Sequence, residues 1–275
     1  MNILYCGNNK VEDGLLLSVL SLIRNINEPI HIYILTMEIT TTDNAYQPIS
    51  GRFAAYLDGV IKKANPEHTV LMMDITGLFQ DELPAANLGS RFTPYCMLRL
   101  FADKIPDMPD KILYLDIDVI CRKDFTKFYY QDISAYEFAG VLDYYGRWFF
   151  RRDLFHLDYM NSGVLLLNLK RIRETGLFQR CRQLCMNKKM FMPDQSAINK
   201  IAAARKTLPR CYNEQRRMQE NTVFQHFTTT FRIFPWLHTL TVKPWQIDKV
   251  HRKLKLHEYD DLFSEYTKLL PEIKN

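Results

Sequence analysis

The chain has 275 residues, of which 47% are hydrophobic and 24% are charged. These values are ordinary for a globular protein and exclude a disordered chain, and the length is enough for one large domain with or without a small appended part. The net charge of +5 is modest, so it suits an anionic small molecule or a membrane surface and does not call for nucleic acid.

The six cysteines are scattered along the chain without the spacing of a zinc site. No run approaches the ~20 consecutive apolar residues that a membrane-spanning helix needs. We therefore expect reduced thiols and a cytoplasmic protein. The tail from Ile247 mixes leucines with many charges, which predicts an amphipathic helical cap; peripheral contact of this tail with the inner face of a membrane is the alternative.

Strand and helix signals alternate over the first half of the chain. Three stretches are strand-like: 2–6, 31–35 and 69–75. Apolar residues at three- and four-residue spacing predict the helices between them: 15–23 and 49–61. Thr93-Pro94 predicts a further helix start, with Thr93 as N-cap. This alternation predicts a mainly parallel sheet covered by helices, in which ligands bind at the carboxyl ends of the strands.

The run from Lys111 to Ile120 is a buried-strand pattern interrupted only by Asp116 and Asp118. Side chains two apart on a strand share a face, so we expect these carboxylates to point the same way. Two like charges beside an apolar strand repel and lose hydration, and a divalent cation that also holds a phosphate would compensate them. The apolar run favours this interpretation over the simpler one, in which Asp116 caps a turn and Asp118 is solvated.

The second half of the chain offers polar residues next to predicted strands and helices. Asp143 follows a short strand at 138–142 and opens a stretch to Arg152 that is rich in arginine and aromatic residues. Loop packing and stacking on a sugar ring are equally good interpretations of that stretch. Asn161 leads into a buried strand that ends near Leu169, and one helix is expected from about Lys170 to Asn187.

Two further residues have both a structural and a functional interpretation. Asp194 lies where Pro193 opens a helix, and taken alone it is best interpreted as a residue that favours the helix dipole. His226 is flanked by aromatic residues, as core histidines usually are. As a third ligand beside two aspartates, its imidazole would suit Mn²⁺ better than Mg²⁺.

Taken together, blocks of this sequence resemble the bacterial members of glycosyltransferase family 8, the retaining galactosyl- and glucosyltransferases of lipopolysaccharide assembly. Five blocks occur in the family's order: 4–9, 95–99, 114–118, 161–169 and 194–195. A sixth block, His226-Phe227 with Lys243-Pro244-Trp245, is stretched. The resemblance extends from residue 2 to about residue 245.

The resemblance implies an α/β, Rossmann-like nucleotide-sugar-binding fold of the glycosyltransferase A type over residues 1–245, with a mainly parallel twisted sheet flanked by helices. Residues 246–275 would form a small helical cap packed on it. The implied reaction is the retaining transfer of glucose or galactose from a UDP-sugar to a hydroxyl of a glycan or glycolipid. The implied cofactor is Mn²⁺, with Mg²⁺ as the alternative ion.

The resemblance also implies roles for individual residues. The metal ligands would be three residues: Asp116, Asp118 and His226. The residues that bind the nucleotide-sugar would include these aspartates and six more: Tyr5, Asn8, Arg99, Ile117, Asn161 and Lys243. Two residues would form the catalytic face beside the donor sugar: Asp194 and Gln195. Asp143 would hold the acceptor.

The sequence departs from the family pattern at two places. Asn8 stands where the family usually carries Asp, which would change one contact to uracil from a charged acceptor to an amide. His226 and Lys243 are seventeen positions apart, and residues 231–241 resemble an insertion in a motif that is otherwise compact. Lys243 would reach the phosphates if the inserted residues form an excursion from the fold.

Two other functions remain open from the sequence. A phosphatase of the haloacid dehalogenase type carries an Asp-x-Asp-x-[Thr/Val] motif, which Asp116 to Val119 also fits. Three strand–helix units precede the motif here, and no matching downstream Lys and paired Asp are evident, so this alternative is disfavoured. A non-catalytic protein that binds a nucleotide-sugar is the other alternative, motivated by Asn8 and by the stretched final block.

Overall fold

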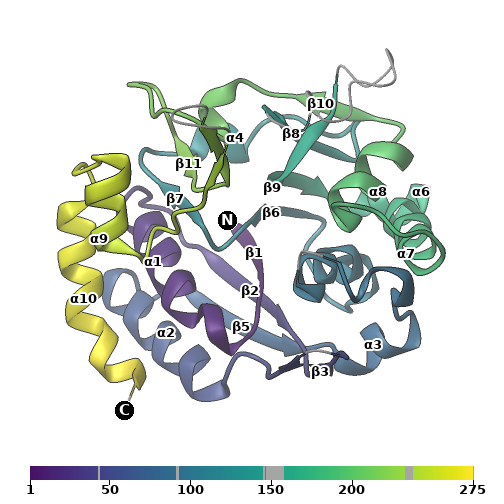
Figure 1. The fold of residues 1–275 in the computed structure, drawn as a ribbon, viewed down its shortest axis with the longest axis horizontal. Helices are drawn as coiled ribbons and strands as arrows, with labels where there is room; N and C mark the ends of the chain where they lie inside the picture. The colour runs from purple at the N-terminus through teal and green to yellow at the C-terminus, as the bar shows by residue number, and fades with distance from the viewer. Residues whose placement is uncertain (43, 91–92, 145, 147–157, 233–237, 275) are drawn as a thin grey trace.

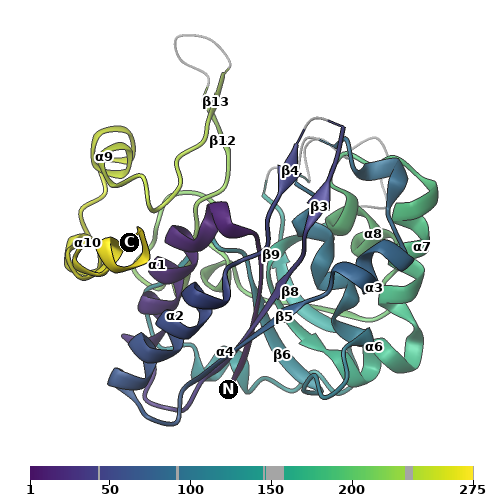
Figure 2. The same cartoon turned by 90° about the horizontal axis from the view of Figure 1, so that it is seen from below.

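The computed structural model describes the chain except for residues 43, 91–92, 145, 147–157, 233–237 and 275. Most of the stretch rich in arginine and aromatic residues that follows Asp143 therefore lies outside the described residues. The described residues form a central seven-stranded sheet with helices on both faces (Figures 1 and 2).

The strand order in the sheet is β10-β8-β9-β6-β1-β2-β5. In chain order the strands are β1 (Asn2–Cys6), β2 (His31–Thr36), β5 (Thr69–Asp74), β6 (Lys111–Leu115), β8 (Phe138–Leu142), β9 (Met160–Asn168) and β10 (Arg205–Thr207). Strand β9 runs antiparallel to both β6 and β8, whereas the other neighbouring pairs are parallel. The predicted mainly parallel sheet is confirmed.

The helices form two layers, one on each face of the sheet (Figure 2). One layer holds α1 (Glu12–Ile23), α2 (Gly51–Ala64) and α10 (Asp260–Lys274). The other holds α3 (Thr76–Asp81), the 3₁₀ helix η3 (Pro94–Lys104), α6 (Leu169–Thr175), α7 (Leu177–Asn187) and α8 (Pro193–Ile201). Each layer packs its own apolar cluster on the sheet, and alternate residues of a strand belong to different clusters.

Two predicted helices differ from the observed ones. The helix expected after Thr93 is the 3₁₀ helix η3, and the Thr93 side chain makes no capping hydrogen bond. The single helix expected over 170–187 is divided into α6 and α7 at Gly176, whose φ of 66° lies in the left-handed region. Glycine enters this region without a steric penalty, so it ends α6 and redirects the chain into α7.

The strand expected over 111–120 is also shorter than predicted. Strand β6 ends at Leu115, and a turn follows in which the Val119 amide donates to the Asp116 carbonyl at 3.1 Å. Strand β7 (Val119–Cys121) then leaves the main sheet and pairs antiparallel with β11 (Phe224–His226). The register places His226 opposite Val119, immediately after the two aspartates. A turn and a second ladder, rather than strand alternation, bring these side chains together.

The inserted residues near the C-terminus include a β-hairpin. Strands β12 (Thr230–Arg232) and β13 (His238–Leu240) pair antiparallel and project from the body of the molecule (Figure 2). The chain then returns to the sheet edge at Lys243 and continues through α9 (Ile247–Lys249) and the π-helical turn η5 (Val250–Leu254). The described inserted residues therefore project away from the fold, which allows Lys243 to lie beside Asp118.

Helix α10 closes the described chain by packing on α1. Leu262, Phe263 and Tyr266 are buried in the same apolar cluster as the α1 leucines. The Tyr56 hydroxyl of α2 also donates to the carbonyl of Leu269 at 3.1 Å. No described helix combines the length and the apolar character that a membrane crossing requires.

The remaining short elements are η1 (Asn9–Val11), β3 (Ile39–Thr40), β4 (Ala45–Tyr46), η2 (Ala85–Asn87), α4 (Thr126–Tyr129) and η4 (Arg210–Tyr212). Strands β3 and β4 pair antiparallel with each other. Of this group, η1 and η4 bear on the site, because Asn8 precedes the first and Asn213 follows the second.

Candidate active site

A cavity of about 550 Å³ opens where β1 and β6 end and β9 and α8 begin. The residues predicted for the site that line it are Asn8, Arg99, Asp116, Ile117, Asp118, Asp143, Asn161, Asp194, Gln195, His226 and Lys243. Residues from both ends of the chain thus meet at one edge of the sheet. This is the edge at which α/β sheets bind their ligands.

Tyr5 is the predicted contact residue that the structure does not bring to the cavity. Its side chain is fully buried, and its hydroxyl lies 2.9 Å from the hydroxyl of Ser18 on α1. Side chains alternate along β1, so Tyr5 faces the α1 layer while Cys6 and the residues after it reach the cavity. The Tyr5 side chain therefore lies outside the cavity in which the other predicted site residues meet.

Asp116, Asp118 and His226 converge inside the cavity. Nε2 of His226 lies 3.6 Å from a carboxylate oxygen of Asp116 and 3.3 Å from one of Asp118. One ligand atom from each residue lies within 4.8 Å of the others. Two carboxylates and an imidazole around one point form a donor set that fits a divalent cation.

The close approach of these three side chains depends on Gly163. A Cβ atom at this position would lie 2.1 Å from Cε1 of His226 and 2.7 Å from a carboxylate oxygen of Asp116. Both distances are far shorter than a van der Waals contact, so any larger residue would displace the histidine or the aspartate. The glycine after Asn161-Ser162 is therefore a spatial requirement of the site.

Lys243 completes the charge balance of the aspartate pair. Its ammonium group donates to the carboxylate of Asp118. Burial raises the pKa of Asp118, but the charges of Lys243 and His226 outweigh burial and hold that pKa well below its usual range. Burial in turn lowers the pKa of Lys243, and the charge of Asp118 outweighs it, so that pKa is raised.

Arg99 forms ion pairs with two carboxylates of the site, Asp116 and Asp194. It is nearly fully buried on η3; Nη2 lies 2.9 Å from a carboxylate oxygen of Asp116, and Nε lies 3.4 Å from one of Asp194. Nη1 donates to the carbonyl of Ser162, and the guanidinium lies over the Tyr114 ring with its carbon 3.8 Å from the ring centroid. Each nitrogen of Arg99 thus has a protein acceptor, so this residue positions the two carboxylates.

A second polar group lies beside the aspartate pair. Nε2 of Gln195 donates to a carboxylate oxygen of Asp143 at 2.8 Å, and Nδ2 of Asn161 donates to the same oxygen at 3.3 Å. The amide oxygen of Gln195 accepts from the backbone N–H of Ser162 at 2.9 Å. The Ser162 hydroxyl donates to Asp194 at 3.1 Å. Asp143, which follows β8, thus forms one buried network with residues of β9 and α8.

Asn213 is a site residue that the sequence did not indicate. The backbone N–H of Gly163 donates to Oδ1 of Asn161 at 2.9 Å, which makes that oxygen an acceptor. Nδ2 of Asn213 donates to the same oxygen at 2.9 Å, so Oδ1 of Asn213 faces Nδ1 of His226, 3.1 Å away. Nδ1 of His226 therefore carries a proton, and Nε2 is the nitrogen that faces the aspartates. No sequence motif marks Asn213.

Comparison with known proteins decides the family. The model of the family described as "Glycosyl transferase family 8" matches residues 2–248. The chain belongs to glycosyltransferase family 8. The resemblance expected from the six blocks is confirmed, and a haloacid dehalogenase-type phosphatase is not supported.

Curated relatives of this family 8 chain are distant. It is 31% identical over 94 residues to glycosyltransferase GlyA of Streptococcus pneumoniae, which covers 34% of this chain and 13% of GlyA. It is 24% identical over 227 residues to a lipopolysaccharide 1,2-glucosyltransferase of Escherichia coli, covering 66% of this chain and 63% of that protein. The chain thus spans less than two thirds of the length of either relative.

Solved structures resemble this family 8 chain over nearly its whole length. An active-site mutant of LgtC superposes with a TM-score of 0.67 at 17% identity, covering 99% of this chain and 96% of LgtC. The galactosyltransferase LgtC in complex with donor and acceptor sugar analogs gives 0.64 at 16% identity, with 96% of each chain covered. These likenesses show the glycosyltransferase A fold, as predicted.

Proposed function

We propose that this family 8 glycosyltransferase moves a hexose, glucose or galactose, from a UDP-sugar to a hydroxyl of a glycan or glycolipid, with retention at the anomeric carbon. The observation that carries the proposal is the convergence of Asp116, Asp118 and His226, with Lys243 beside them, in one cavity at the carboxyl ends of β1 and β6. The relatives named for lipopolysaccharide glucosyl transfer and for galactosyl transfer support the substrate class.

The donor set fits Mn²⁺ better than Mg²⁺, because one of the three ligands is an imidazole nitrogen. Asp116, Asp118 and His226 would hold this ion, which would neutralise the diphosphate leaving group when bound. Lys243 would then exchange its contact with Asp118 for a phosphate oxygen, because its side chain is one-third exposed and lies at the cavity wall. The ion and Lys243 would together stabilise the negative charge that develops on the UDP leaving group, which would lower the barrier to transfer.

The network of Asp143, Asn161 and Gln195 would hold the donor sugar and the acceptor. Asp194 is buried and paired with Arg99, so it acts by fixing Ser162 and the start of α8 rather than by attacking the sugar. Gln195 is a poor nucleophile because its amide is neutral, and we assign it to orientation of the donor sugar. We assign Asp143, whose buried carboxylate belongs to this network, to holding the acceptor hydroxyl.

Asn8 would contact the nucleotide at the end of β1. Its side-chain oxygen accepts from the Lys10 amide at 3.0 Å and caps η1. The amide nitrogen is then the group that Asn8 presents to a ligand, which favours a base or ribose oxygen as its partner.

The test is a donor panel of UDP-glucose, UDP-galactose and related UDP-sugars, with Mn²⁺ or with EDTA. Binding of the correct donor stabilises the folded chain, so its melting temperature should rise only with Mn²⁺. Slow release of UDP from one donor, accelerated by a sugar acceptor, is expected alongside. An equal rise in EDTA would overturn the metal site. Mn²⁺-dependent binding without hydrolysis or transfer would instead favour a non-catalytic binding protein.

A further inference from the structure

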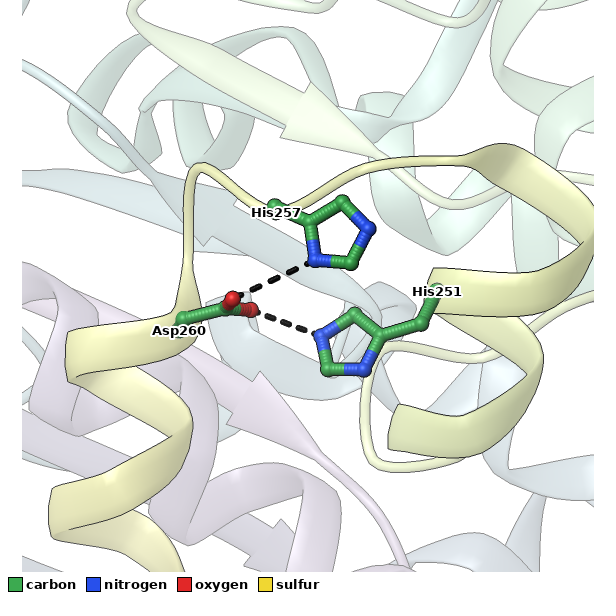
Figure 3. A group of neighbouring side chains, drawn as sticks. All are labelled: His251, His257 and Asp260. Atoms are coloured by element: carbon green, nitrogen blue, oxygen red, sulfur yellow. Dashed lines mark hydrogen bonds and ion pairs between the residues drawn. The ribbon is translucent and has the colours of Figure 1, made fainter.

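A second group of metal-ligating side chains lies outside the cavity, near the start of α10. His251 belongs to η5, His257 to the loop after it, and Asp260 is the first residue of α10 (Figure 3). Nε2 of His251 lies 2.6 Å from one carboxylate oxygen of Asp260, and Nδ1 of His257 lies 3.3 Å from the other. Both imidazoles thus point a ring nitrogen at the same carboxylate.

A backbone turn at Lys255 brings His257 next to His251. Lys255 adopts a φ of 53°, in the left-handed region, which ends η5 and reverses the chain. The His257 ring returns over the His251 ring, with centroids 4.6 Å apart and planes 16° from parallel. The His251 ring also contacts Phe263 edge-on, with centroids 6.0 Å apart, which joins it to α10. A non-glycine residue rarely adopts positive φ without stabilising surroundings.

The chemistry of the three groups fits a transition-metal ion. One ligand atom from each residue lies within 4.8 Å of the others. Zn²⁺ binds imidazole nitrogen and carboxylate oxygen at about 2.0–2.2 Å, and sites with three protein ligands complete the shell with water. The His251, His257 and Asp260 side chains are 30%, 66% and 50% exposed. They can therefore adjust by small rotations, and an ion can reach them from solvent.

The neighbouring charges leave the carboxylate available. The guanidinium of Arg252 pairs with Asp248 at 3.3 Å, and Arg122 pairs with Glu258, so these cations are not bound to Asp260. Lys253 and Lys255 follow on the same segment, which would reduce the affinity for a cation without blocking the site.

We propose that His251, His257 and Asp260 form a second metal site, for Zn²⁺ or a similar transition-metal ion, separate from the ion of the catalytic centre. The ion would fasten η5 to the start of α10. It would thereby brace the segment that follows Lys243-Pro244-Trp245. Because the folded chain holds the three ligands around one point, an ion that binds there should stabilise the fold.

The test is a calorimetric titration of the full chain with Zn²⁺. The proposed site of Asp116, Asp118 and His226 should also take up Zn²⁺, so we expect two classes of site in the wild type. His257→Ala and His251→Ala should each lose one class, whereas Asp118→Asn should keep that class and lose the other. Arg252→Ala, which removes an exposed side chain of the same turn, is the matched control and should bind as the wild type does.

A second measurement separates a metal site from a purely structural hydrogen bond. The melting temperature of the Asp118→Asn chain should rise with Zn²⁺, and adding His257→Ala should abolish that rise. An unchanged zinc stoichiometry in both histidine variants, or zinc affinity only in the millimolar range, would overturn the proposal. A lower melting temperature of His257→Ala without metal, with no difference in zinc binding, would assign the cluster to hydrogen bonding alone and would also overturn it.

Discussion

Oδ1 of Asn213 lies 3.1 Å from Nδ1 of His226, and the Asn161 contact on the other side of the same amide sets its orientation. This series of hydrogen bonds begins at the backbone N–H of Gly163, a donor that no side-chain rotation can turn into an acceptor. A main-chain group therefore determines which nitrogen of His226 faces Asp116 and Asp118.

Asn213→Ala should weaken Mn²⁺ binding by about 10- to 100-fold, the usual effect of losing a group that orients a ligand. The reason is that His226 would lose the acceptor that holds its ring and its tautomer. Titration of Mn²⁺ followed by electron paramagnetic resonance measures the affinity. Asn187→Ala, which removes an exposed amide at the end of α7, is the control. Equal affinities in all three chains would remove Asn213 from the site.

Gly163→Ala should abolish Mn²⁺-dependent donor binding. The added Cβ atom would lie 2.1 Å from the His226 ring, and neither β9 nor β11 has room to yield. Gly59→Ala, in the middle of α2 with nothing within 4 Å of the new atom, is the matched substitution. It should keep donor binding and raise the free energy of unfolding by about 0.5–1 kcal/mol. Donor affinity that is unchanged in Gly163→Ala would contradict the observed geometry.

Lys243→Met should separate metal binding from turnover. The Lys243 ammonium group competes with a metal ion for the Asp118 carboxylate. Its removal should therefore leave the affinity for Mn²⁺ equal to or higher than that of the wild type. Turnover should fall by roughly 10²- to 10³-fold, because a cation at the leaving group is lost. Steady-state kinetics at saturating Mn²⁺ and metal titration give the two quantities. Lys62→Met, on the exposed side of α2, controls for loss of charge; loss of metal binding in Lys243→Met would count against this role.

The pH dependence of stability should report Asp118 in the metal-free protein. Its pKa is lower in the folded state than the value of about 4 in an unfolded chain. The unfolded state therefore binds more protons below about pH 4, and stability falls as pH decreases through this range. The contribution of the ionised Asp118 carboxylate to the free energy of unfolding is therefore complete above about pH 4 and is lost as the pH falls. Urea unfolding in EDTA between about pH 2 and 6 should show a shallower slope for Asp118→Asn than for the wild type; identical slopes would exclude the coupling to Lys243 and His226.

Local sequence pattern was sufficient for the parts of the fold that depend on local chemistry. The apolar strands and the spacing of the helices predicted the alternating α/β layers, because burial of one helix face and both sheet faces leaves a direct pattern. The apolar spacing predicts one helix where Gly176 divides α6 from α7, although the glycine itself is a signal for a helix end. The 3₁₀ geometry of η3 has no comparable pattern.

The site was only partly readable from the sequence. The apolar run around Asp116 and Asp118 indicates these two residues, and the family blocks add Gln195 and His226. Strand alternation predicts the convergence of the two aspartates. That convergence is made instead by the turn after Leu115 and by the pairing of β7 with β11. The family resemblance implies a nucleotide contact for Tyr5, whereas the alternation of β1 turns this side chain toward α1.

The sequence by itself determined the class of the fold, the family and the three residues proposed to hold a metal ion, because these follow from residue types and their order. Only the tertiary structure decided that Lys243 returns to Asp118 after the β12–β13 hairpin, that Asn213 sets the His226 tautomer, and that His251, His257 and Asp260 meet. Those relationships join residues through space, and their distances depend on the packing of whole elements. No local pattern records them.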